Sequence, residues 1–315
     1  TQEVPCSQFP TMMMNINITM LRTVRGSLIF LSTARAFTSQ QQRQQLKSME
    51  NYQSSYLLGA IIGDIVGSRF EHSRGRVKTT EFDLVTTKCK FTDDTVLTIA
   101  VADALINRKP YADTIRKWAN KYPGAGYGKT FRQWMRDDAM GPYQSWGNGS
   151  AMRVSPCGYL PTLEKVLEEA KVSAECTHDH EEGIKGAQAT AACIFLARNG
   201  KSKEEIKQYV TDNFGYDLNR SIEEIRPTYK FEVSCQKSVP EAIIAFLDSE
   251  SYEDTIRLAV SLGGDTDTQA AIAGSIAQAF YKKIPPELES QAKRKLNEEI
   301  TDIVNAFNSQ IECFE

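Results

Sequence analysis

The stretch 261-SLGGDTDTQAAIAGSIAQAF-280 places two glycines, two carboxylates and two hydroxyls directly before a long run of small apolar residues. The apolar residues recur with the period of a helix and predict one from Thr266 to Tyr281. Asp265 and Asp267 stand at the junction of loop and helix, where both carboxylates can turn toward one point while Thr268 adds a hydroxyl. A helix start needs one capping side chain, so this stretch holds more oxygen ligands than capping explains.

A second acidic stretch, FTDDT at residues 91–95, precedes another segment with helical period. Thr92 can cap this helix, and Asp93 and Asp94 suit the positive end of its dipole. Capping alone would explain one such cluster. Two clusters favour a metal site, because four carboxylates in one place repel each other unless a cation lies between them. Such hard oxygen ligands favour Mg²⁺, Mn²⁺ or Ca²⁺ over zinc or copper, and so many acids fit a pair of metals about 3.5–4 Å apart.

The rest of the chain from residue 51 also has mainly helical periodicity. The predicted helices are Tyr56–Val66, Thr92–Ile106, Leu163–Ala174, Ile184–Ala197, Val239–Leu247, Thr255–Leu262, Thr266–Tyr281 and Ser290–Phe307. Strand-like alternation is confined to short pieces such as Lys230–Ser234, and YKKIPPELES (281–290) is predicted as a surface turn before the last helix. No repeat or linker divides the chain. We therefore predict an all-α fold, with a single compact multi-helix domain over residues 51–315.

Residues 1–50 differ in composition from the rest of the chain. They contain one acidic residue before Glu50 but several arginines, and an apolar run from Met20 is followed by the polar tract TSQQQRQQLKS. Such a composition fits an organelle transit peptide or a flexible extension. We therefore predict that residues 1–50 are a flexible N-terminal extension or a targeting segment, and that the protein is cytoplasmic or organellar rather than secreted.

The overall composition argues against several classes of protein. With 37 basic and 40 acidic residues and a net charge of −3, the chain has no basic excess for general nucleic-acid binding or for an anionic membrane surface. No apolar run reaches the about 18 residues of a membrane-spanning helix. The seven scattered cysteines form no Cys-x-x-Cys pair, so buried reduced thiols are favoured over disulfides or a zinc site.

The stretch LLGAIIGDIVGSRFE, residues 57–71, predicts a helix that packs closely on another helix. Its glycines recur every fourth residue and leave a smooth stripe that a neighbouring helix can approach. Asp64 is an acid inside this apolar segment, where a carboxylate must pair with or coordinate something. Glu71 follows in the loop after the helix, from which it could reach a metal or a reacting group.

The stretch WGNGSAMRV, residues 146–154, is a glycine-rich turn before a helix. The free N–H groups at such a helix start suit a phosphate, although a plain turn would have the same composition. Trp146 and Tyr143 could stack on a base, although large aromatics beside turns are more often core residues. His178 and His180 form an H-x-H pair, but without a partner Cys or His nearby a polar contact or a helix-end role is favoured over zinc.

With these motifs in this order, the chain resembles the ADP-ribosylglycohydrolase family. The resemblance covers about Tyr56 to Leu288 and rests on GAIIGDIVGSRFE, FTDDT, GNGSAMRV, VPEAIIAFL and SLGGDTDTQAAIAGSIAQAFY. The paired TDD and GGDTDT motifs are the most specific of these. The resemblance implies an all-helical fold with two Mg²⁺ ions, or Mn²⁺ in their place, at the base of a cleft that takes ADP-ribose.

The resemblance also implies roles for individual residues. The metal ligands would be Thr92, Asp93, Asp94, Asp265, Asp267 and Thr268. The diphosphate cradle would be formed by Gly147, Asn148, Gly149 and Ser150. Asp64 would support the ligands from behind, His178 would lie near the ADP-ribose, and Glu71 would be a mobile carboxylate that contacts metal or substrate. Glu71 or Asp94 would steer or deprotonate the attacking water.

The function implied by the resemblance is metal-dependent hydrolysis of the glycosidic bond between ADP-ribose and an acceptor, which reverses ADP-ribosylation. The partner would be an ADP-ribosylated protein or a small-molecule ADP-ribose conjugate. The loops that would recognise the acceptor match no family pattern, so arginine, serine, threonine, acetyl and nucleic-acid linkages all stay open. The same ligands could serve a two-metal phosphoester hydrolase. A non-catalytic ADP-ribose-binding or crystallin-like relative would have lost ligand acids, and all of them are present here.

Overall fold

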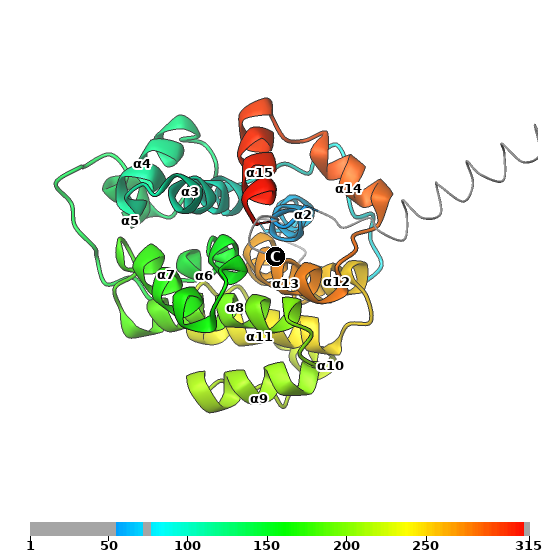
Figure 1. Ribbon diagram of the computed structural model, residues 1–315. Coiled ribbons are helices and arrows are strands. Elements are labelled where there is room, and N and C mark those ends of the chain that lie inside the picture. Colours follow the sequence, from blue (N-terminus) through cyan, green and yellow to red (C-terminus); the bar gives the residue numbers. More distant parts are fainter. Residues whose placement is uncertain (1–54, 72–76, 312–315) are drawn as a thin grey trace, which may run out of the picture. The chain divides into compact units, whose positions relative to one another are not determined.

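The helix predicted from the opening stretch, α13 (Thr266–Tyr281), has the predicted bounds and lies at the centre of the fold (Figure 1). Its residues from Thr266 to Ala279 are all buried. The helices that pack most closely on it are α2 (Leu58–Gly67), α8 (Glu181–Arg198), α11 (Cys235–Asp248) and α12 (Tyr252–Ser261). The computed structural model describes residues 55–71 and 77–311, and the segment predicted over residues 1–50 lies outside them.

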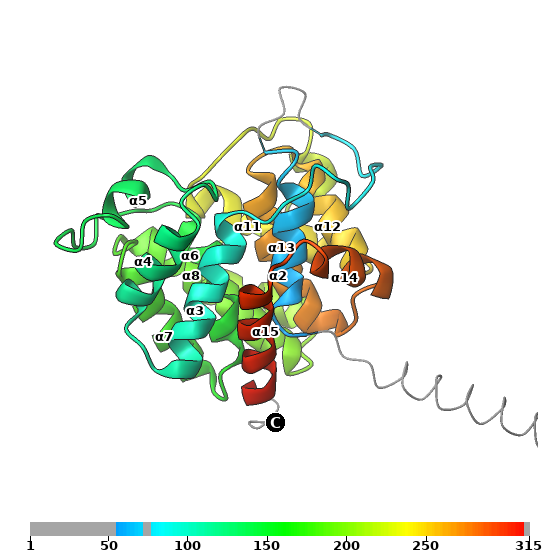
Figure 2. The same cartoon turned by 90° about the horizontal axis from the view of Figure 1, so that it is seen from above.

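Helices α2 and α13 lie side by side in both views of the ribbon (Figures 1 and 2) and pack closely along their lengths. A Cβ atom on Gly63 would lie 2.1 Å from the Ala270 carbonyl oxygen, and one on Gly59 or Gly67 would lie 2.4 Å from another α13 carbonyl oxygen. Only glycine leaves room for so close an approach. The predicted glycine stripe is confirmed, and it brings the end of α2 beside the start of α13.

The remaining helices surround this pair. They are α3 (Asp93–Asn107), α4 (Tyr111–Lys121), α5 (Lys129–Trp134), α6 (Gly149–Met152), the 3-10 helix η1 (Ser155–Tyr159), α7 (Leu163–Glu175), α9 (Lys203–Phe214), α10 (Ile222–Ile225), α14 (Pro286–Lys293) and α15 (Glu298–Ile311). Residues 55–71 and 77–311 contain no strand, only an isolated antiparallel bridge between Gly147 and Ser234. The all-α prediction is confirmed, and the strand-like piece 230–234 lies in a loop.

Two predictions near the end of the chain were wrong. The helix predicted over 290–307 is two helices, α14 and α15, and Asn297 begins the second by accepting a hydrogen bond from Ile300 N (3.1 Å). The segment 281–290, predicted as a turn, contains the start of α14. Pro286 takes the first position of this helix, where the missing N–H of proline needs no partner.

The described cysteines bear on the prediction of buried thiols. The cysteines at 89, 157, 176, 193 and 235 are all free, and four of them are buried. None of the helices in the described part of the chain is long and apolar enough to cross a membrane.

Candidate active site

Acidic side chains from distant segments meet where the end of α2 lies beside the starts of α3 and α13. Asp64, Asp94 and Asp267 each place one carboxylate oxygen within 4.8 Å of the other two, and all three residues are buried. Glu71, Asp265 and Asp267 form a second group that meets the same limit. The two acidic stretches of the sequence are therefore brought together by the packing of α2 on α13.

Asp64 holds the start of α3 against α2. Its carboxylate accepts hydrogen bonds from the backbone N–H and the hydroxyl of Thr92 (2.8 and 2.7 Å) and from the same two groups of Thr95 (3.1 and 2.5 Å). Thr92 also caps α3, with its hydroxyl 3.4 Å from Asp94 N. An acid inside an apolar helix must find partners, and here its partners fix the residues that lead into the acidic group.

The acids of this site disfavour each other's charge. Burial, followed by the charge of Asp64, raises the pKa of Asp93 to about 8, and burial, followed by a neighbouring aspartate, raises the pKa of Glu71 to about 7. Burial also raises the pKa of Asp94 and Asp267 well above the usual range, with repulsion from nearby carboxylates adding to it. Without a compensating positive charge, these side chains would share protons instead of being fully ionised.

The same residues fit a divalent cation. Asp94 Oδ1 is buried and has no hydrogen-bond partner. Asp93, Asp94 and Asp267 pair with no Lys or Arg side chain of the described residues. The atoms that could coordinate a metal are carboxylate oxygens and the hydroxyl oxygens of Thr92 and Thr268. Mg²⁺ and Mn²⁺ prefer such oxygen ligands. A cation would satisfy the free Asp94 oxygen and remove the mutual repulsion.

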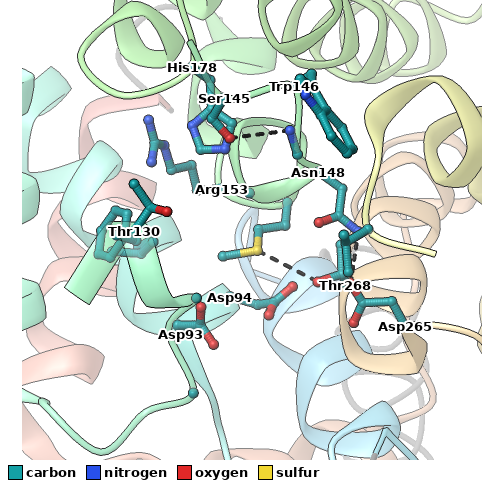
Figure 3. A pocket seen from close by; sticks show the side chains of 18 of the residues that line it. Asp93, Asp94, Thr130, Ser145, Trp146, Asn148, Arg153, His178, Asp265 and Thr268 are labelled. Carbon is teal, nitrogen blue, oxygen red and sulfur yellow. Dashed lines mark hydrogen bonds between the residues drawn. The ribbon is translucent and has the colours of Figure 1, made fainter. Parts of the chain in front are cut away.

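The acids form one end of a cleft of about 540 Å³ (Figure 3). Its other walls include the turn 145–149, the α5 segment 128–131, His178 and the loop 231–233. The turn and the loop are joined by a hydrogen bond from Asn148 N to Val233 O (2.7 Å). Trp146 and Phe231 line this cleft, and as whole residues they are 47% and 41% exposed. Such a cavity, with acids at one end and open aromatic rings near its glycine turn, suits a polar ligand that also has a ring.

Two members of the predicted diphosphate cradle use their side chains elsewhere. Asn148 Nδ2 donates to Asp265 Oδ2 (2.8 Å) and so holds one carboxylate of the acidic group. Ser150 is fully buried, its hydroxyl donates to Gly183 O (2.7 Å), and it does not line the cleft. The Ser150 side chain points this way because α6 begins at Gly149 and directs the next residue toward α8. The cradle of backbone N–H groups over residues 147–150 stays a prediction.

Most other predicted site residues do line the cleft. They are Glu71, Asp93, Asp94, Gly147, Asn148, Gly149, His178, Asp265, Asp267 and Thr268. His178 lies against the glycine turn, since a Cβ atom on Gly149 would be 3.2 Å from its Nε2 atom. The second histidine of the H-x-H pair, His180, accepts a hydrogen bond from Glu182 N (3.1 Å) and caps α8, which is the helix-end role expected for it.

Several cleft residues gave little or no signal in the sequence. Thr130 and Phe131 of α5, Phe231 and Val233 of the loop before α11, and Arg153 all line the cleft. The glycine-rich stretch KYPGAGYGK before α5 predicts a loop, but nothing in it indicates that this part of the chain lines a cleft. Phe231 and Val233 lie in the strand-like piece, whose alternation points to a sheet rather than to a cleft wall.

Comparison with known proteins places the chain beside one family. Residues 52–312 match the sequence model of the ADP-ribosylglycohydrolase family. ADP-ribosylhydrolase ARH3 of Gallus gallus is 27% identical, and the alignment covers 75% of this chain and 88% of that protein. ADP-ribosylarginine hydrolase Tri1 of Pseudomonas putida (strain GB-1) is 28% identical, with 78% of this chain and 76% of that protein covered. A solved structure described as an ADP-ribosylglycohydrolase-related protein complex has the same fold, with a TM-score of 0.64, 24% identity, and coverage of 82% of this chain and 96% of that chain.

Proposed function

The chain belongs to the ADP-ribosylglycohydrolase family, and on that premise we propose that it uses divalent cations to hydrolyse the glycosidic bond between ADP-ribose and an acceptor. The observation that carries the proposal is the group of carboxylates from α2, α3 and α13 at one end of the cleft. The relatives support the reaction, since ARH3 is named an ADP-ribosylhydrolase and Tri1 an ADP-ribosylarginine hydrolase. The substrate would be an ADP-ribosylated protein or a small-molecule ADP-ribose conjugate.

Two Mg²⁺ ions, or Mn²⁺ in their place, would be held by the oxygen donors of the acidic group. These donors are Thr92, Asp93, Asp94, Asp265, Asp267 and Thr268. The free Asp94 Oδ1 atom and the raised pKa of Asp267 support a cation at this end of the cleft. When bound, such cations would grip the ribose hydroxyls and offset charge as the reaction proceeds.

Other groups of the cleft would bind the substrate and activate the water. The backbone at Gly147 and Gly149, with His178 beside it, would bind the diphosphate and place the distal ribose against the acids. Glu71 lies half-buried at the edge of the acidic group and would accept a proton from the attacking water, with Asp94 as the second candidate. The water oxygen would bond to the anomeric carbon, the bond from that carbon to the acceptor would break, and the acceptor would leave with a proton.

The adenine would occupy the end of the cleft away from the acids. Trp146 is an exposed ring in the glycine turn, and Phe231 lines the cleft from the loop that is hydrogen-bonded to this turn. Stacking on an open aromatic ring is worth about 1–3 kcal/mol per base. This arrangement would leave the acidic end free for the ribose that carries the acceptor.

A substrate panel tests the proposal. The purified chain is given peptides that carry ADP-ribosyl-arginine or ADP-ribosyl-serine, and a phosphomonoester, each with Mg²⁺, Mn²⁺ or EDTA. We expect release of ADP-ribose from at least one conjugate with either cation and none in EDTA. Full activity in EDTA would contradict the metal scheme, and release of phosphate alone would favour the phosphoester alternative. Binding of ADP-ribose without any release would indicate a non-catalytic binding protein.

A further inference from the structure

Arg153 lines the cleft, yet its guanidinium is fully buried (Figure 3). It forms no ion pair with a carboxylate of the described residues. Nη2 donates to Ser173 O (2.7 Å) and to Thr177 Oγ1 (2.9 Å), whereas Nε and Nη1 are buried without a partner. A buried charge that leaves donors unused opposes folding, so its place in the cleft wall indicates a function beyond packing.

Thr177 connects Arg153 to His178. Its side chain is fully buried, and Oγ1 lies 2.7 Å from His178 Nδ1. A guanidinium can only donate, so the Thr177 oxygen accepts from Arg153 and its own proton remains to be placed. Among the described residues, His178 Nδ1 is the only acceptor within reach of this hydroxyl. The hydroxyl therefore donates to Nδ1, and a neutral ring must carry its proton on Nε2.

The Nε2 atom of His178 faces the glycine turn of the cleft. A Cβ atom would lie 3.2 Å from it on Gly149 and 3.7 Å from it on Gly147, so the ring and the turn share the wall assigned above to the diphosphate. Building on the proposed function, we infer that Arg153 and Thr177 are positioning residues that lock His178 as the Nε2–H tautomer, which gives the diphosphate a fixed hydrogen-bond donor.

The surroundings of His178 keep the ring neutral. Burial, followed by the charge of Arg153, lowers the pKa of His178 well below the usual range. Among the described residues no carboxylate is hydrogen-bonded to the ring, and the neighbouring Asp179 carboxylate instead accepts from the backbone and side-chain amides of Gln144 (both 2.6 Å). Tyr143, whose ring centre is 6.2 Å away, has a pKa raised to about 12 and stays uncharged. The neutral ring thus keeps its Nε2–H donor near neutral pH, and the positive charge that attracts a phosphate belongs to Arg153 behind it.

The tautomer can be read directly by nitrogen NMR. The chain has three histidines, so long-range ¹H–¹⁵N correlation spectra of labelled protein remain simple. His178→Gln identifies the signals of His178 by removing them, and His180→Gln is the matched control that leaves them in place. We expect the neutral Nε2–H pattern for His178 from about pH 5.5 to 8. An Nδ1–H tautomer or an imidazolium in the wild-type protein at about pH 6.5 would overturn the proposal.

Two variants of Thr177 test whether fixing the His178 tautomer strengthens the binding of ADP-ribose. Thr177→Val keeps the shape and removes the hydroxyl, whereas Thr177→Ser keeps the hydroxyl. With Mg²⁺ present, calorimetric titration with ADP-ribose should show about three- to tenfold weaker binding for the valine variant, the size expected of one hydrogen bond. Its His178 spectrum should show mixed tautomers, and its KM should rise more than its kcat falls. The serine variant should restore both the spectrum and the affinity.

The two sets of measurements separate this proposal from the proposed function. If Thr177→Val had wild-type affinity and an unchanged His178 spectrum, the inference that Thr177 fixes the tautomer of His178 would be wrong. The hydrolase assignment would remain intact. A wild-type protein that does not bind ADP-ribose would instead contradict the proposed function. The NMR spectrum needs neither metal nor activity, so it would then decide for or against the tautomer by itself.

Discussion

Asp267 is shared by both groups of acidic oxygens, since it lies with Asp64 and Asp94 in one and with Glu71 and Asp265 in the other. It is buried, and its pKa is raised by burial first and then by the neighbouring carboxylates. The charge of such a residue has two opposite effects. It opposes folding when no cation is bound, and it attracts a cation when one is available.

Asp267→Asn should therefore change stability and activity in opposite directions. In EDTA the variant should melt about 2–4 °C above the wild type, because the loss of one repelling charge is worth about 1 kcal/mol. Mg²⁺ should stabilise the variant less than the wild type, and turnover of an ADP-ribosyl conjugate should fall by about a thousandfold or more. Thermal melting with and without Mg²⁺, combined with steady-state kinetics, measures both effects. Full turnover in the variant would remove Asp267 from the site.

The stability of the metal-free protein should fall as the pH rises from about 5 to 8. In the folded protein the pKa of Glu71 is about 7 and that of Asp93 about 8, whereas in the unfolded chain both titrate near about 4. The folded state thus holds more protons between these values. Its stabilisation is complete below the unfolded pKa and is lost as the pH rises through the folded pKa.

Melting temperatures in EDTA across this pH range check the prediction. Saturating Mg²⁺ provides the control, because bound cations keep the carboxylates ionised and should remove most of the slope. A melting temperature that rises with pH in EDTA would show that these acids do not carry raised pKa values in the folded protein.

At the scale of elements, the contact between α2 and α13 sets the geometry of the site. The two helices touch through backbone, and this contact places Asp64 of α2 beside Asp267 of α13. A change in the distance between the helices therefore changes the distance between the carboxylates. Stability and metal binding depend on the same contact.

Gly63→Ala should damage both properties. The added Cβ would lie 2.1 Å from the Ala270 carbonyl oxygen, so the helices must separate, at an expected loss of about 3 kcal/mol or more of unfolding free energy. Gly141→Ala is the control, because nothing lies within 4 Å of its added Cβ and its effect should stay within about 0.5 kcal/mol. Urea unfolding and Mg²⁺ titration measure the two effects. Equal urea midpoints for the two variants would contradict the close packing of α2 on α13.

Among the helices that the sequence predicted correctly, α13 has a long run of small, mainly apolar residues. α13 is buried from Thr266 to Ala279, and its start and end were both predicted from this run. α9 was missed because few of its residues are apolar: apart from Ile206 and Val210, none of them is buried. Its sequence signal is a capping box between Ser202 and Glu205, which indicates where a helix begins but not that it packs on a core.

At the scale of the whole molecule, the acids could be predicted because each cluster is local in sequence. FTDDT and GGDTDT present their oxygens within a few residues, and only the meeting of the two clusters needed the fold. The wall of the cleft formed by the loop 231–233 could not be predicted in this way. Val233 faces the cleft because its carbonyl accepts a hydrogen bond from Asn148 N, a contact between segments with no shared pattern. The Arg153–Thr177–His178 chain likewise depends on tertiary packing.

Cation binding should stabilise the molecule unevenly, because the proposed ligands join the ends of helices that are distant in sequence. Mg²⁺ at about 100 times its dissociation constant adds about 2.7 kcal/mol, so amides in α2 and in the first turns of α3 and α13 should exchange up to about 100-fold more slowly. α9 lines no part of the cleft, packs mainly on α8 and buries few residues, so it opens locally and its exchange should barely change. Hydrogen exchange followed by mass spectrometry, in Mg²⁺ and in EDTA, measures the difference. The same comparison on Asp267→Asn should show little protection, whereas protection of the three helices in that variant would place the cation elsewhere.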